Sequence, residues 1–152
     1  MTGGTVVVTA EALKRVGVFS TDFRAAENWD LWLRICKVYS ARVVSDPLIK
    51  YRIHSENMSG DGELMLSSKL QIIEKHCDLH SKDAVTARYS RRAYADYHYR
   101  MGLNYFAAAQ YQRARKEFLT VLGFSLFYED TWLRLLRTLL GEPGNRFLRD
   151  LK

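Results

Sequence analysis

Residues 27–34 read ENWDLWLR and place two carboxylates, two indole rings and one guanidinium within about two helical turns. Glu27 and Asp30 stand at the beginning of this stretch, where the helix dipole favours acidic side chains. Arg34 follows Asp30 by four residues, and an acid placed N-terminal to its basic partner is the favourable order for an ion pair on a helix. The stretch therefore predicts a helix over residues 27–40 with an ion pair on one face.

The chemistry of this predicted helix allows two interpretations. Its apolar side chains recur at helical spacing over a wide arc, as Trp29, Leu31 and Leu33 show, and such an arc is typical of a well-buried helix. In the first interpretation the helix is a capped, salt-bridged element of the core. In the second interpretation its start, which carries Glu27 and Asp30, forms the floor of a polar cleft.

The composition is that of an ordinary globular protein. The chain has 152 residues, of which 47% are hydrophobic and 26% charged, and this length suits one domain or two small subdomains. No apolar run approaches the roughly 20 residues that span a bilayer, and residues 6–8 are too short for a signal peptide. Cys36 and Cys77 have no metal-like spacing and fit a reducing, cytoplasmic environment. His76 and His80 lie four residues apart, but the sequence places no third zinc ligand beside them.

The positive charge is concentrated in the second half of the chain. Residues 1–82 carry 11 basic and 10 acidic groups, whereas residues 83–152 carry 12 basic and 7 acidic groups. A basic surface attracts nucleic acid, anionic lipid headgroups or phosphorylated substrates. The arginines and tyrosines of residues 88–105 fall at helical spacing, which is more typical of a core with a solvated rim than of a nucleic-acid platform. Nucleic-acid binding is therefore not favoured.

The first 60 residues predict strands as well as helices. Residues 5–9 form a β-branched run that predicts a buried strand, and residues 10–16 predict a short helix that ends at Gly17. Residues 42–45 predict a second strand. Residues 48–54 alternate in polarity and predict a third, whose polar face ends in Arg52 and His54. A polar, glycine-containing linker follows, and we expect a boundary near residue 60.

The remainder of the chain predicts only helices, at residues 63–80, 83–109, 111–122 and 129–140. Gly102, Tyr105, Ala114 and Phe118 fall at the spacing of a tetratricopeptide hairpin, in which small residues allow close approach and aromatic residues fill the gap. Only about one and a half units are visible, fewer than the three or so that a free-standing array needs. The pattern predicts a helical accessory layer.

The motifs of the first part, in their order, resemble a known enzyme family. They are VGVF at residues 16–19, ENWDLWLR at 27–34, YRIH at 51–54 and NMS at 57–59. Together they resemble the C-terminal half of the catalytic domain of family 2 glycosyltransferases, the inverting GT-A type. The resemblance covers roughly residues 3–60 and implies a GT-A remnant over residues 1–60. With the tetratricopeptide-like antiparallel helical bundle that the spacing predicts over residues 61–152, we expect an α+β, mostly α fold.

The resemblance also implies catalytic roles at the start of the 27–34 helix. In that family the residue after the glutamate is an aspartate that acts as general base and deprotonates an acceptor hydroxyl, whose oxygen then attacks the anomeric carbon of a nucleotide-sugar. Here that position is Asn28, and an amide accepts no proton at neutral pH. Either Glu27 or Asp30 substitutes as the base, or Asn28 only orients the acceptor and activity is weak or absent.

Four further residues are substrate-binding candidates by the same resemblance: Trp29, Arg34, Arg52 and His54. The family pattern makes His54 a ligand of the metal–diphosphate and places Arg52 against the diphosphate or the acceptor. Arginine suits this role because its planar guanidinium matches phosphate oxygens.

The donor side of such an enzyme is missing from the sequence, which has no Asp-x-Asp motif and no first half of a nucleotide-binding domain. We expect Mg²⁺ or Mn²⁺ to accompany the nucleotide-diphosphate sugar in a full-length enzyme, with no cofactor tightly bound to this chain. The expected acceptor is a glycan or a lipid-linked sugar at the inner face of a membrane, where the basic tail would dock. The alternative is a non-catalytic helical protein-binding module with a degenerate transferase segment.

Overall fold

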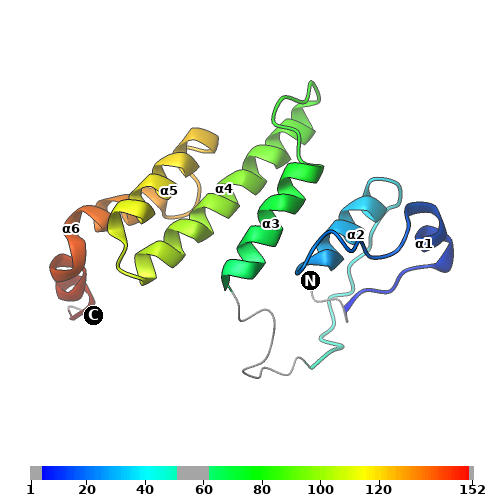
Figure 1. The fold of residues 1–152 in the computed structure, drawn as a ribbon, viewed down its shortest axis with the longest axis horizontal. Helices are drawn as coiled ribbons and strands as arrows, with labels where there is room; N and C mark the ends of the chain where they lie inside the picture. The colour runs from blue at the N-terminus through cyan, green and yellow to red at the C-terminus, as the bar shows by residue number, and fades with distance from the viewer. Residues whose placement is uncertain (1–4, 51–61, 151–152) are drawn as a thin grey trace. The chain divides into compact units, whose positions relative to one another are not determined.

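The computed structural model describes residues 5–50 and 62–150, which form six helices and no strand (Figure 1). The chain divides into two compact units, residues 1–76 and residues 77–152. The helices of the first unit are α1 (Ala10–Val16), α2 (Glu27–Cys36) and α3 (Gly62–His76). Those of the second unit are α4 (Ala84–Ala107), α5 (Tyr111–Phe124) and α6 (Thr131–Asp150).

Helix α1 begins and ends where its sequence predicts. The Thr9 hydroxyl accepts a hydrogen bond from the Ala12 N–H at 3.2 Å and so caps the helix start. Gly17 ends the helix with a φ of 83°, a left-handed conformation that a glycine adopts without strain, and its N–H donates to the Leu13 carbonyl. The prediction of a helix over residues 10–16 is confirmed.

The core of the first unit is small. Helix α2 contacts both α1 and α3. Phe23 and Ala26, which precede α2, pack against Ile72 of α3, and Met65 covers this cluster from one side. Leu31 of α2 is also buried. Helix α2 ends at Cys36, earlier than the predicted residue 40, so the apolar side chains that follow it lie outside a helix.

The prediction of an α+β fold with a strand remnant is wrong. Residues 6–9 and 42–45 have no regular secondary structure, and residues 48–50, the described part of the third predicted strand, have none either. Val7 is fully exposed and Val43 is 80% exposed. A strand exists only when its N–H and C=O groups pair with a neighbouring strand, and the described residues provide no neighbour. β-Branched composition alone therefore does not make these segments strands.

The second unit is built on an antiparallel hairpin of α4 and α5, which lie side by side (Figure 1). Asp83 caps α4 by accepting a hydrogen bond from the Thr86 N–H at 2.8 Å. Gly102 of α4 faces Phe118 of α5, which is completely buried, as is Ala114. The predicted close approach of the two helices at Gly102 and Ala114 is confirmed.

Helix α6 is fixed to the hairpin by polar contacts. The Tyr99 hydroxyl donates to Asp130, and the Tyr128 hydroxyl donates to Asp96 at 2.9 Å. The guanidinium of Arg115 donates to the Thr138 carbonyl at 3.0 Å. A kink interrupts α6 at Gly141, where φ is 62°, so the helix turns there without a side-chain clash.

The contact beneath Gly102 predicts opposite effects for two glycine-to-alanine substitutions. A Cβ on Gly102 would lie 2.6 Å from a ring carbon of the buried Phe118, whereas a Cβ on Gly123 would have no neighbour within 4 Å. We expect Gly102→Ala to lower the free energy of unfolding by about 1–3 kcal/mol through overpacking. Gly123→Ala should raise it by about 0.5–1 kcal/mol because alanine favours the helix. Urea unfolding measures both, and stabilisation by both would contradict this packing.

Candidate functional site

The candidate site is the first turn of α2, which carries four of the predicted residues. Helix α2 begins after Ala26, whose φ of 58° places it in the left-handed region, a strained conformation for a residue with a Cβ. Ala26 provides no side-chain cap for the helix. The turn is held in place instead by tertiary contacts of Asp30, its last member.

Asp30 is completely buried and is surrounded by cationic and donor groups. One carboxylate oxygen, Oδ2, accepts from the Arg34 Nε at 2.8 Å. The other, Oδ1, lies 2.8 Å from His76 Nε2 and 3.1 Å from Lys75 Nζ, both at the end of α3. Both carboxylate oxygens are thus engaged, with three partners in all, so burial of this charge is compensated.

Arg34 links Asp30 to the end of α1. Its Nη1 donates to the Val16 carbonyl and its Nη2 donates to the Val18 carbonyl at 2.7 Å. The Val16 carbonyl belongs to the last turn of α1, where carbonyls lack helical partners, and Val18 follows the cap at Gly17. The i, i+4 ion pair between Asp30 and Arg34 that the sequence predicts is confirmed, and it joins α1 and α2.

His76 completes this arrangement from α3. Its Nδ1 lies 3.2 Å from Lys37 Nζ. A lysine ammonium only donates, so this contact places the ring proton on Nε2, from which it is donated to Asp30. The structure thus uses His76 as a link between α3 and α2. Among residues 5–50 and 62–150, no three His, Cys, Asp or Glu side chains are grouped to hold a metal ion.

The contacts of Asp30 also set its protonation state. Burial by itself raises the pKa of a carboxyl group, but the hydrogen bonds from His76, Arg34 and Lys75 and the charge of Arg34 outweigh it. They lower the pKa of Asp30 to about 2 from its ordinary 3.8. An aspartate with so low a pKa holds a proton poorly near neutral pH, so the geometry gives Asp30 a structural role.

The remaining residues of the turn have fewer contacts. Asn28 Oδ1 is buried and has no hydrogen-bond partner among the described residues. The Trp29 ring is 41% exposed, and Lys69 Nζ lies 5.6 Å from its centroid. Glu27 is partly buried and forms no ion pair with a described residue. Glu27 and the Trp29 ring are therefore the part of the turn that a ligand can reach, because Asn28 Oδ1 is buried.

Arg52 and His54, the predicted diphosphate and metal ligands, lie outside the described residues. Sequence reasoning missed Lys75 and His76 as neighbours of Asp30. His76 lies 46 residues from Asp30, and no local pattern marks that pairing. A buried carboxylate needs more than one cationic partner, so the sequence indicates that Asp30 has a further partner besides Arg34. It does not indicate which residue that partner is.

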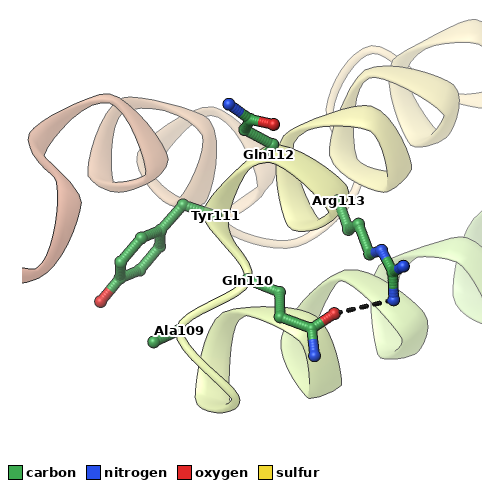
Figure 2. A pocket seen from close by; sticks show the side chains of 5 residues that line it. All are labelled: Ala109, Gln110, Tyr111, Gln112 and Arg113. Carbon is green, nitrogen blue, oxygen red and sulfur yellow. Dashed lines mark hydrogen bonds between the residues drawn. The ribbon is translucent and has the colours of Figure 1, made fainter.

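Two pockets lie on the second unit. Residues 109–113, which cover the end of the α4–α5 connection and the first turn of α5, line a shallow one of about 500 Å³ (Figure 2). Arg113 is its only charged lining residue, and its Nη1 already donates to Gln110 Oε1 at 3.0 Å. The second pocket is a groove of about 820 Å³ between α4 and the α5–α6 connection, and three arginines line it.

Comparisons of the chain with protein-family models, with curated proteins and with solved structures find no match. The likeness to family 2 glycosyltransferases therefore rests on the motifs of residues 16–59. A search of the described residues finds no helix that combines the length and apolarity needed to cross a membrane.

The environment of Asp30 predicts a pH-dependent stability. Asp30→Asn should lower the free energy of unfolding near neutral pH by roughly 2–4 kcal/mol, because it removes the buried charge that Arg34, Lys75 and His76 all contact. The pKa of Asp30 is lower in the folded chain than in the unfolded chain, so its ionisation favours folding. This contribution is complete above about pH 4 and is lost as the pH falls towards about 2.

Urea unfolding of both proteins across this pH range tests the prediction. The matched control is Asp22→Asn, because the Asp22 side chain is 71% exposed and lies 3.7 Å from Lys75. Its effect should stay below about 0.5 kcal/mol. Equal stability of Asp30→Asn and the unsubstituted chain at neutral pH would contradict the role given to Asp30.

Proposed function

We propose that this chain carries the acceptor side of a family 2-like glycosyltransferase. Such an enzyme moves a sugar from a nucleotide-diphosphate donor to a glycan or lipid-linked acceptor, on the cytoplasmic face of a membrane. The observation that carries the proposal is that the residues of α2 differ in their contacts. Asp30 and Arg34 are engaged in structural contacts, whereas Glu27 and Trp29 remain accessible at the helix start.

The chemistry of the first turn fits an acceptor site. A sugar hydroxyl can donate a hydrogen bond to the partly exposed Glu27 carboxylate, and a sugar ring can lie against the 41% exposed Trp29 ring. In the transfer step the acceptor oxygen bonds to the anomeric carbon, the bond to the nucleotide diphosphate breaks, and the proton passes to a carboxylate. Glu27 is the candidate base because Asn28 accepts no proton and Asp30 is held by its cations.

The exposed apolar side chains of the first unit also fit a chain that packs against the nucleotide-binding half of such an enzyme. Val7, Val43, Val44 and Leu48 are each more than half exposed. We infer that this half covers them. Mg²⁺ or Mn²⁺ would be held with the diphosphate on that half, with His54 reaching it by the family resemblance. The described residues do not by themselves offer a metal site.

A second candidate is a non-catalytic protein-binding module. The observation in its favour is Asn28, which replaces the expected base with a group that cannot accept a proton. On this view the first unit is a scaffold and the helices of the second unit recruit a partner.

Binding of a nucleotide diphosphate separates the two candidates. We expect Mn²⁺ with UDP or GDP at about ten times Kd to raise the melting temperature by about 3–5 °C. The shift should disappear in His54→Ala and persist in His80→Ala, since His80 is exposed and lies outside the motifs. A shift that is absent with both nucleotides, or that survives His54→Ala, would favour the binding module.

The proposal further predicts that the chain alone transfers no sugar, because the donor half lies outside it. UDP-glucose or GDP-mannose with Mn²⁺ and a disaccharide acceptor should give product no faster with the chain than without it. Product formation by the purified chain, measured by release of nucleotide diphosphate together with extension of the acceptor, would show that the site is complete.

A further inference from the structure

Helix α6 has an inverted distribution of polar and apolar side chains. Its buried face carries Thr131 and Thr138, which are both almost completely buried. Its apolar side chains point outward instead and recur at i, i+1, i+4, i+7 and i+8, so they form one continuous stripe along the helix. This apolar stripe consists of Trp132, Leu133, Leu136, Leu139 and Leu140, each about half or more exposed.

The α5–α6 connection extends the apolar stripe. Leu126 is 59% exposed and Phe127 is 89% exposed, and together they form an apolar loop tip. The Trp132 indole N–H donates to the Leu126 carbonyl at 2.8 Å, which fixes the loop tip against the first turn of α6. The loop tip and the stripe are therefore one continuous surface, larger than the scattered apolar residues that a solvated surface normally shows.

An arginine groove borders this surface. Arg88, Arg91 and Arg92 project from one face of α4 at i, i+3 and i+4, and they line the 820 Å³ groove together with Phe127 of the loop tip. All three arginines are exposed, and none forms an ion pair with a described residue. Glu129 is the one acidic side chain in the lining. The groove thus presents a net positive charge directly beside exposed apolar side chains.

We propose that the apolar stripe, the loop tip and the arginine groove form a docking surface for an anionic phospholipid membrane. The apolar side chains would enter the boundary between headgroups and acyl chains, with the Trp132 ring at the level of that boundary. The three guanidiniums would bind headgroup phosphates, whose oxygens they match in geometry. The inference deepens the membrane-face part of the proposed function, and it concerns the second unit rather than α2.

Charge and shape together favour a membrane over a nucleic acid or a second copy of the chain. A nucleic acid would satisfy the arginines but would leave the leucines of the stripe in water, because bases stack on aromatic faces. A second copy of the chain would cover the leucines, but a two-fold interface would bring equivalent arginine grooves towards each other. A membrane with acidic headgroups satisfies both the charge and the apolar area.

Vesicle sedimentation of the full chain tests the proposal. Vesicles of phosphatidylcholine with about 30% phosphatidylserine should bind the chain, and vesicles of phosphatidylcholine alone should bind it at least tenfold more weakly. Arg88→Gln/Arg91→Gln should weaken binding to the anionic vesicles by roughly tenfold or more. Phe127→Ser and Leu136→Ser/Leu139→Ser should each weaken it about tenfold, and these side chains are exposed, so the fold should be retained.

The matched control is Arg113→Gln/Lys116→Gln, which removes the same charge from the exposed surface of α5 away from the groove. It should change binding by no more than about twofold if the docking surface is specific. Equal binding to both kinds of vesicle, or equal loss in the control and in Arg88→Gln/Arg91→Gln, would overturn the proposal. The proposal would also be overturned if the chain bound no vesicles and instead formed a concentration-dependent dimer that Leu136→Ser/Leu139→Ser dissociates. The same holds if it bound no vesicles and bound an oligonucleotide through the arginines. No nucleotide is present, so the outcome is independent of the transferase test.

Discussion

The buried carboxylate of Asp30 is the constraint on which the first unit depends. Three helices meet at this one side chain: α2 carries it, α1 is joined to it through Arg34, and α3 brings Lys75 and His76. An ionised group in the interior is tolerated only when its hydrogen-bonding capacity is used. The apolar cluster of Phe23, Ala26 and Ile72 packs between the same elements, and the polar contacts of Asp30 hold the first turn of α2 in place.

Local sequence patterns predict the helices well and fail for the strands. Helix α1 has its cap at Thr9 and its stop at Gly17, and the α4–α5 hairpin has its small residues at Gly102 and Ala114, so both are encoded within a few residues. A strand is different because its hydrogen bonds belong to another segment. Residues 6–8 have the composition of a strand, but composition cannot provide the partner that pairs with it.

In the candidate site, too, local sequence patterns predict some contacts and not others. The ion pair of Asp30 with Arg34 follows from a spacing of four residues, and the sequence predicts it correctly. The contact of Asp30 with His76 spans 46 residues and follows from the packing of α3 on α2, which no local pattern records. The outward stripe of α6 is a further case. Periodicity locates an apolar face, but only the neighbours of the helix decide whether that face is buried, and here the threonine face is buried instead.

The distance along the chain between Asp30 and His76 has a consequence for synthesis on the ribosome. When α2 leaves the exit tunnel, its carboxylate has Arg34 nearby, but the end of α3 has not been made. Burial of Asp30 before that moment would isolate a charge without its full set of donors, so the nascent first unit should stay open. Closure then waits for residues 75 and 76, and a chain halted before them would expose the apolar side chains of α2 to chaperones and proteases.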